Sequence, residues 1–347
     1  MIVITPNTGS FGGIERTIEL LRSRDGGSLC ILAVPGKPFI RRWSDFKLVW
    51  ALSKALRSTP DEPIFVRNFY TLFWVWIARL LAWRDNRIYY QSPGVYPVQI
   101  FYQFRALGVP KALSRSLAEV FSLFELFLIN RCAKVFAFND FLKQNYCLWY
   151  PSQCLADKMQ VIRPGLDYEW GLTEAEIEVP ADGPELLYFG RLDGQKGLEA
   201  LVTCILNHPQ LRLKIIGAGR SEVMLRELSR GAANIEFAAP IRDKRALAKE
   251  IIAAQYSVVP SVYEPYGHVV WEAISLGRSV LTVNRMISKF TGHGFLEKGD
   301  PRLISFSNEE ALVAYVLHGG GKDKASSLVT TDRSWDDYFD DLQEYCR

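Results

Sequence analysis

The sequence has few of the residues that form disulfide frameworks or metal sites. Its 347 residues include four histidines and six cysteines, and the cysteines form no C-x-x-C pair. No histidine stands at metal-ligand spacing from a cysteine. A disulfide framework and a zinc site are therefore both unexpected, which is typical of a protein from a reducing cytosol.

Long apolar runs are also missing. No uninterrupted run reaches the roughly 18 residues that a membrane-spanning helix needs. The longest candidate, at 69–83, is interrupted by Arg79. The first ten residues lack a basic segment and a long apolar core, so we predict no signal peptide. A composition of 48% hydrophobic and 23% charged residues predicts a folded, soluble protein, and the length suggests two domains.

Several signatures of other enzyme classes do not occur. There is neither the G-x-x-x-x-G-K-[ST] loop of nucleoside triphosphatases nor the G-x-S-x-G elbow of α/β-hydrolases. A dinucleotide fingerprint starting at Gly217 would need glycine where the chain has Glu222, so we predict only a tight turn there. No D-x-D triplet, with which many nucleotide-sugar enzymes hold a metal, occurs. We therefore expect no metal and no cofactor, with phosphates neutralised by cationic side chains and helix N–H groups.

The small net charge of +3 conceals an asymmetry. Residues 1–165 carry 21 Lys and Arg against 11 Asp and Glu, whereas residues 166–347 carry 20 against 27. The basic half also holds most of the tryptophans. This pattern is compatible with weak contact with an anionic membrane or a phosphorylated partner, or with charges scattered over an aromatic core; we expect no nucleic-acid partner. The candidate membrane contacts are Arg41, Arg42, Trp43 and Lys47.

Short apolar strands alternate with helical patterns along the chain, which predicts parallel sheets covered by helices. The first series includes strands at 2–5, 29–34, 63–68, 87–92 and 134–139. An acidic, breaker-rich stretch at 166–184 predicts a linker before a second series begins. We therefore expect an α/β fold of two Rossmann-like domains facing each other across a cleft. The predicted parts are an acceptor-side domain at 1–165, the linker at 166–184, a nucleotide-sugar domain at 185–330 and a C-terminal helix at 331–347. One option for this helix is to pack against the first domain.

The stretch SVYEPYGHVVWEAISLG at 261–277 brackets a helix start with two carboxylates. Pro265 and Gly267 break the chain before the helix, whose first N–H groups attract anions. Yet Glu264 precedes that start, and Glu272 lies about a turn and a half inside it. A ligand with an anionic middle and hydroxyl-rich ends suits both features. A nucleoside diphosphate sugar has this layout.

A second polar loop, FGRLDGQKG at 189–197, follows a predicted strand. Its Arg191 and Lys196 can clamp a diphosphate, although a solvated turn is an equal alternative. Because ligands of such sheets bind beyond the carboxyl ends of the strands, we expect this loop to converge with the loops at 5–13 and 261–267.

These motifs resemble a known family. The segment E-P-Y-G-H-V-V-W-E-A is similar to the E-x7-E signature of retaining glycosyltransferases of family 4, which have the GT-B fold. The segments V-V-P-S, G-R-L-x-x-x-K-G and V-I-R-P-G-L-D match the family in order and spacing, and G-G-I-E-R at 12–16 resembles its N-terminal glycine loop. The resemblance covers roughly residues 1–290.

The resemblance implies a role for each motif residue. Glu264 would contact the donor sugar, and Glu272 the ribose hydroxyls. Arg191 and Lys196 would stabilise the departing diphosphate, which would itself help to deprotonate the acceptor. The other donor-side candidates are Tyr266, Gly267 and His268 through their backbone, together with Gly12, Gly13, Gln91 and Ile241. The acceptor-side candidates are Glu15, Arg16 and Ser92.

The chain departs from the family in two places. Many members have a histidine near the donor sugar where this chain has Gln91 and Ser92, and a glutamine cannot titrate. His268 is the sole histidine inside a motif. It would contact the ligand either through its side chain or only through its backbone N–H. We expect the other three histidines to lie on the surface. The segment RMISKFTGHGF replaces the usual glycine-rich turn and acidic helix, so the identity of the donor does not carry over.

The sequence thus predicts a retaining, metal-independent transferase of the cytoplasm or the inner membrane face. It would move a sugar from a nucleoside diphosphate sugar to a glycan or lipid-linked acceptor, in bacterial surface polysaccharide or lipopolysaccharide assembly. One alternative, motivated by the missing histidine, is a catalytically weak partner subunit that binds nucleotide sugars. The other is a nucleotide-sugar epimerase, for which the chain offers few acid and base residues.

Overall fold

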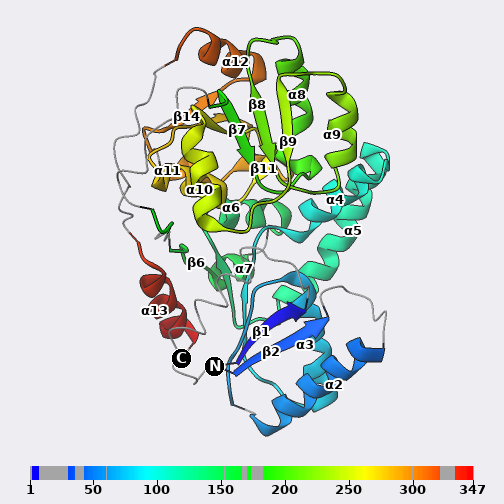
Figure 1. The fold of residues 1–347 in the computed structure, drawn as a ribbon. Coiled ribbons are helices and arrows are strands. Elements are labelled where there is room, and N and C mark those ends of the chain that lie inside the picture. Colours follow the sequence, from blue (N-terminus) through cyan, green and yellow to red (C-terminus); the bar gives the residue numbers. More distant parts are fainter. Residues whose placement is uncertain are drawn as a thin grey trace. The chain divides into compact units, whose positions relative to one another are not determined.

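Two compact units make up the chain. The computed structural model describes residues 2–7, 30–35, 43–59, 61–151, 153–165, 170–172, 183–298, 300–320 and 333–346 (Figure 1). The first unit comprises 1–99, 116–165 and 334–347, and the second comprises 100–115 and 166–333. Residues 100–115 therefore group with the second unit, although we had placed them in the first domain.

The first unit is built on a six-stranded parallel sheet with the strand order β2-β1-β3-β4-β5-β6. Its strands are β1 (Ile2–Asn7), β2 (Cys30–Pro35), β3 (Ile64–Val66), β4 (Ile88–Gln91), β5 (Lys134–Ala137) and β6 (Met159–Val161). The central strands β3 and β4 are buried along their whole length. A parallel sheet buried in this way needs helices on both faces.

One face of this sheet is covered by a layer of helices. Right-handed crossovers that step across the sheet in one direction put their helices on the same side. These helices are α2 (Trp43–Ser58), α3 (Phe69–Ala82), α5 (Lys111–Ile129), α6 (Asp140–Trp149) and α7 (Gln153–Lys158). Asn68 and Asn139 cap α3 and α6, because each side-chain oxygen accepts a hydrogen bond from a first-turn N–H.

The last helix of the chain, α13 (Trp335–Cys346), completes the same unit. Its Trp335, Tyr338 and Leu342 are almost fully buried. They share one apolar cluster with Val3 and Phe65 of the sheet, which lie more than 260 residues earlier in the sequence. The first unit therefore takes part of its core from a segment that follows the whole second unit.

The second unit has its own six-stranded parallel sheet, in the order β14-β12-β10-β7-β8-β9. Its strands are β7 (Leu186–Phe189), β8 (Leu213–Ile216), β9 (Ile235–Ala238), β10 (Tyr256–Val259), β12 (Val280–Val283) and β14 (Leu303–Phe306). The helices are α4 (Tyr96–Ala106), whose later residues group here, α8 (Leu198–Leu206), α9 (Glu222–Leu228), α10 (Lys244–Ala253), α11 (His268–Ser275) and α12 (Glu309–Leu317). A two-stranded parallel pair, β11 (Tyr263–Glu264) and β13 (Gly292–His293), follows β10 and β12.

Glycines let the loops at the carboxyl edge of this sheet approach one another closely. Gly217 has φ 157°, and a Cβ there would lie 1.9 Å from the carbonyl oxygen of Gly190. Gly197 has φ 68°, and its Cβ would lie 2.1 Å from the carbonyl oxygen of Pro260. Only glycine fits at both places. The loops after β7, β8 and β10 are thereby packed backbone to backbone.

The predicted α/β class with parallel sheets is confirmed. The sequence did not reveal α4, α7, α12, β14 or the β11–β13 pair. Among the residues that the structure describes, none of the helices combines the length and the hydropathy that crossing a bilayer requires.

We predict that Gly197→Ala destabilises the protein by about 1–3 kcal/mol more than Gly231→Ala does. Both glycines have positive φ, 68° and 81°, so both variants share the cost of a left-handed alanine. Gly231 has no atom within 4 Å of an added Cβ, whereas Gly197 meets Pro260. Urea unfolding with an unchanged m-value measures the difference. An equal loss of unfolding free energy in the two variants would show that the loop after β10 moves without cost to make room for the added Cβ.

Candidate active site

Glu264 is fixed in place by the small β11–β13 pair. It lies opposite His293 in the parallel register, and the N–H of Gly294 donates to its carbonyl oxygen at 2.9 Å. The residue is 8% exposed. A carboxylate at such a depth needs a cation or several hydrogen-bond donors.

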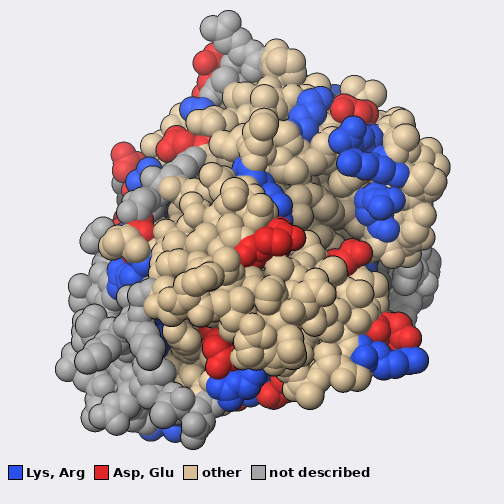
Figure 2. Space-filling view, turned by 90° about the horizontal axis from the view of Figure 1, so that it is seen from above, with Lys and Arg blue, Asp and Glu red and all other residues tan. Residues whose placement is uncertain are grey.

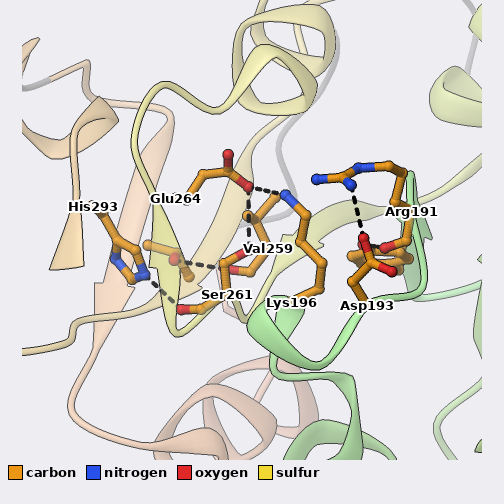
Figure 3. A network of polar contacts seen from close by, with 9 residues as sticks. Arg191, Asp193, Lys196, Val259, Ser261, Glu264 and His293 are labelled. Carbon is orange, nitrogen blue, oxygen red and sulfur yellow. Dashed lines mark hydrogen bonds and ion pairs between the residues drawn. The ribbon is translucent and has the colours of Figure 1, made fainter. Parts of the chain in front are cut away.

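Lys196 supplies that cation from the neighbouring loop. It ends the short helix η2 (Gly194–Lys196), and its Nζ forms a hydrogen-bonded ion pair with Oε2 of Glu264 (Figure 3). The two loops are also joined through the backbone, because the N–H of Val262 donates to the carbonyl of Gln195 at 2.8 Å. Ser261 Oγ lies 3.4 Å from the same carboxylate oxygen. The two predicted site residues are thus direct partners, although 68 positions separate them.

The electrostatics keep Glu264 ionised. Burial alone raises the pKa of its carboxyl, but the charge and hydrogen bond of Lys196, and then Arg191 and His293, outweigh it and hold that pKa below its ordinary value. At neutral pH the site therefore presents a carboxylate, able to accept hydrogen bonds, beside a fixed ammonium group.

Arg191 stands at the exposed side of this pair. Its side chain is 70% exposed and forms an ion pair with Asp193 at 2.8 Å. The hydroxyl of Tyr188, a β7 residue, donates to the carbonyl of Arg191 at 2.6 Å and so fixes the start of the loop. The backbone of Arg191 is thus fixed, while most of its side chain is exposed to solvent. This arrangement suits a ligand that arrives from solvent.

The start of helix α11 lies on the other side of Glu264. Gly267 precedes it with φ 77°, and a Cβ there would meet Cδ1 of Phe295 at 2.7 Å and Cγ of Glu264 at 3.4 Å. The rings of Tyr266 and His268 meet edge to face at 4.6 Å. Glu272 is half-buried in the same helix. The helix start, where the backbone N–H groups attract anions, is therefore within about one turn of Glu264 in the sequence.

His293 is a site residue that the sequence did not reveal, and its predicted surface position is wrong. It is 3% exposed, its Nε2 lies 2.5 Å from the carbonyl oxygen of Ser261, and its ring stacks on Phe295 with centroids 4.9 Å apart. Burial lowers the pKa of His293 despite that hydrogen bond. A histidine between two glycines and before a phenylalanine was the available signal. Of the other two, His318 is exposed and His208 half-buried.

Two predicted site residues of the first unit are buried. Gln91 is 0% exposed, and its Oε1 accepts a hydrogen bond from the hydroxyl of Tyr338 on α13. Ser92 is equally buried and accepts a hydrogen bond from the hydroxyl of Tyr146 at 2.7 Å. Their contacts are therefore with the unit's own core, which does not favour direct roles for these side chains.

The remaining candidates are less constrained. Ile241 is half-buried in the loop after β9. Gly12, Gly13, Glu15 and Arg16 lie outside the residues that the structure describes, so their roles stay predictions. Within the described parts of the chain, no group of three or more His, Cys, Asp or Glu is placed to hold a metal ion.

The sequence also hid a buried acid, Glu125 of α5. Its carboxylate accepts hydrogen bonds from the hydroxyls of Tyr146 at 2.9 Å and Tyr150 at 2.6 Å, and from the N–H of Tyr96 at 3.2 Å. Burial raises the pKa of Glu125 to about 7, against the lowering effect of these donors. This network joins α5 and α6 to the chain that follows β4.

Comparison with known proteins identifies the fold. Residues 183–318 match the family model described as glycosyl transferases group 1. Anabaena HepE, solved in complex with UDP and glucose, superposes with a TM-score of 0.70 over 99% of both chains at 15% identity. The chain has the GT-B fold.

Curated relatives match part of this GT-B chain. Glycogen synthase of Mycobacterium tuberculosis (strain H37Rv) is 31% identical over 135 residues, which are 37% of this chain and 32% of that protein. The lipopolysaccharide core biosynthesis glycosyltransferase LpsE of Rhizobium meliloti is 27% identical over 111 residues, 31% of this chain and 32% of that protein. The matches therefore span about a third of the length of these relatives. The family match at 183–318 includes Arg191, Lys196 and Glu264.

We predict that Lys196→Met lowers the free energy of unfolding by about 3–5 kcal/mol at pH 7, because it leaves a buried carboxylate without its cation. In the wild type the folded pKa of Glu264 is below its unfolded value, so the pair contributes stability above about pH 4.5 and loses it as the pH falls through the folded pKa. In the variant burial should dominate and raise that pKa. The deficit should therefore shrink between pH 7 and pH 5.

The double variant Lys196→Met with Glu264→Gln is the matched control. It removes both charges, so it should recover more than half of the lost stability at pH 7. Chemical denaturation across the pH range measures all three proteins. A deficit that does not change with pH would mean that Glu264 does not depend on Lys196 for its charge.

Proposed function

We propose that the protein is a retaining glycosyltransferase of family 4 that moves a sugar from a nucleoside diphosphate sugar to a glycan or lipid-linked acceptor. The observation that carries this proposal is the buried Lys196–Glu264 ion pair beside the start of α11, within the segment that matches the glycosyl transferases group 1 model. The two glutamates of the E-x7-E pattern, Glu264 and Glu272, stand on either side of that helix start.

The site can divide a nucleoside diphosphate sugar among its parts. Lys196, Arg191 and the first N–H groups of α11 would neutralise the diphosphate without a metal. Glu264, ionised and held rigidly, would accept hydrogen bonds from the donor sugar, and Glu272 would accept from the ribose. Charge-assisted bonds of this kind contribute about 1.5–3 kcal/mol each.

The transfer itself would need little acid or base from the protein. The bond between the anomeric carbon and the diphosphate oxygen breaks, and a bond to the acceptor hydroxyl oxygen forms on the same face of the sugar. The departing phosphate oxygen takes the acceptor's proton. Lys196 and Arg191 would stabilise the negative charge that builds up on that oxygen in the transition state. This route needs no titrating group at the position of the buried Gln91.

The known proteins support the choice of substrates. HepE was solved with UDP and glucose, and a plant starch synthase with a similar structure was solved with ADP and acarbose. LpsE is named for lipopolysaccharide core biosynthesis. We accordingly propose a role in bacterial surface polysaccharide or lipopolysaccharide assembly, at the cytoplasmic face of the membrane. The basic first half of the chain would make the membrane contact.

A catalytically weak partner subunit is the alternative that one observation favours. Gln91 stands where many family members have a histidine, and its side chain bonds to α13. The intact pair of Lys196 and Glu264 favours an active enzyme, because a protein that only binds does not need a desolvated carboxylate near the donor sugar. An epimerase would need more acid and base groups than the described site offers.

We predict that UDP, GDP, ADP and dTDP bind unequally in calorimetry, with one of them clearly tightest and with little dependence on magnesium. Unequal binding without metal is expected because cations and helix N–H groups hold the diphosphate, while the loop after β9 selects the base. If none of the nucleotides binds, the protein would instead be a partner subunit that has the fold but no transferase activity. Strict magnesium dependence would contradict the metal-free account of the phosphates.

We predict that Glu264→Gln and Glu272→Gln separate catalysis from nucleotide binding. Glu264→Gln should leave nucleoside diphosphate affinity within about threefold and reduce kcat by at least about 100-fold, because its contact is with the donor sugar. Glu272→Gln should weaken nucleotide binding by about tenfold, since it removes one charge-assisted bond to the ribose. Calorimetry and initial rates of sugar transfer measure the two effects, and the opposite pattern would reverse the two roles.

A further inference from the structure

The outer faces of α3 and α5 leave large apolar side chains in solvent. The two helices pack side by side, with Phe73 against Phe124 and Trp76 against Phe127 at ring distances of 5.6 and 5.2 Å. The α3–α5 surface, as we call it, consists of Leu80, Leu81, Trp83, Val120, Leu123 and Phe127, all classed as exposed. Several large apolar side chains exposed on two adjacent helices favour an interaction site.

Trp83 is the most informative of these residues. It follows α3 with φ 54° and is the sole non-glycine residue with positive φ in the described part of the chain. Its N–H closes the helix onto the carbonyls of Arg79 and Leu80, a position at which glycine is strongly preferred. Its side chain is nevertheless 91% exposed, so the unit gains almost no packing from it. A strained residue with an unburied indole points to a contact outside the chain.

Arginines lie beside one end of the α3–α5 surface. Arg57 donates to the carbonyl of Leu81 at 2.6 Å, Arg84 donates to the carbonyl of Arg57 at 3.4 Å, and the guanidinium of Arg131 lies 3.6 Å from the centre of the Phe127 ring. The three segments 46–58, 69–85 and 116–131 together carry six Lys and Arg, one Asp that pairs with Arg79, and two Glu. One of those two, Glu125, is fully buried. The α3–α5 surface is thus bordered by positive charge that few carboxylates offset.

Two other parts of the molecule offer a contrast. On the face drawn in Figure 2, basic and acidic side chains occur in small scattered groups among other residues. The opposite face of the first sheet is covered by α13. Its sequence WDDYFDDLQEYC has five aspartates and glutamates, four of them exposed. Positive charge and exposed aromatic residues therefore coincide on the α2–α3–α5 side of the first unit.

We propose that the α3–α5 surface docks the protein on an anionic membrane. Trp83 and the leucines would enter the boundary between lipid headgroups and acyl chains, while Arg57, Arg84 and Arg131 would bind lipid phosphates. This deepens the membrane contact proposed above and moves it from the stretch around Arg41 to the outer faces of α3 and α5. The charge border favours a lipid surface with fixed negative charge over a neutral one.

Flotation with vesicles tests the proposal. The wild type should bind vesicles of phosphatidylcholine with phosphatidylglycerol, bind phosphatidylcholine alone at least about tenfold more weakly, and dissociate as salt rises. Trp83→Gly should reduce the partition coefficient about tenfold. Its thermal midpoint should stay the same or rise, because glycine suits φ 54°. Loss of binding therefore cannot be attributed to unfolding. Arg131→Gln should reduce binding about fivefold, as expected for one basic residue near the surface.

Matched controls lie in the second unit. Val223 is 81% exposed on α9, and the side chain of Arg230 is 77% exposed. Val223→Ser and Arg230→Gln should leave vesicle binding unchanged. Sugar transfer to a water-soluble acceptor should be the same in Trp83→Gly and the wild type, which separates this proposal from the proposed chemistry.

Three outcomes would overturn the proposal. Equal flotation of Trp83→Gly and the wild type, with loss in Arg41→Gln and Arg42→Gln, would keep the membrane contact and reject the α3–α5 surface. A wild type that stays unbound at low ionic strength would remove the membrane contact altogether. Self-association in sedimentation that Trp83→Gly abolishes would assign the surface to a second copy of the chain.

Discussion

The candidate site depends on one buried ion pair, Lys196 with Glu264. Neither charge is stable at that depth without the other, so the loops after β7 and β10 must stay in register with each other. The close backbone approach of Gly197 to Pro260 and the bond from Val262 to Gln195 enforce that register.

The segment that carries His293 also positions the start of α11, the helix that would bind phosphate. His293 holds the carbonyl of Ser261, and Phe295, stacked on His293, lies against the position where Gly267 begins α11. A group that accepts hydrogen bonds and a group of N–H donors are therefore positioned by one small structure, the β11–β13 pair. A shift of the segment that carries His293 would disturb both ends of the site at once.

The sequence predicted the repeating part of the fold, because the alternation of strands and helices is a local property. It did not predict that Lys196 pairs with Glu264, since that contact depends on how two loops approach each other. His293 was missed because two-residue strands have no periodicity. Gln91 was expected near a ligand, but its burial depends on Tyr338, almost 250 residues later.

The position of α13 has a consequence for how the protein is made. The apolar cluster around Val3 and Phe65 includes Trp335, Tyr338 and Leu342, which the ribosome adds only after the whole second unit. Domains generally fold as they are synthesised, N-terminal ones first. Here one face of the first sheet stays incompletely covered until α13 has been synthesised, and the second unit is synthesised before α13. The second unit should thus reach its native state first, and chaperones that bind nascent chains should meet the exposed face of the first.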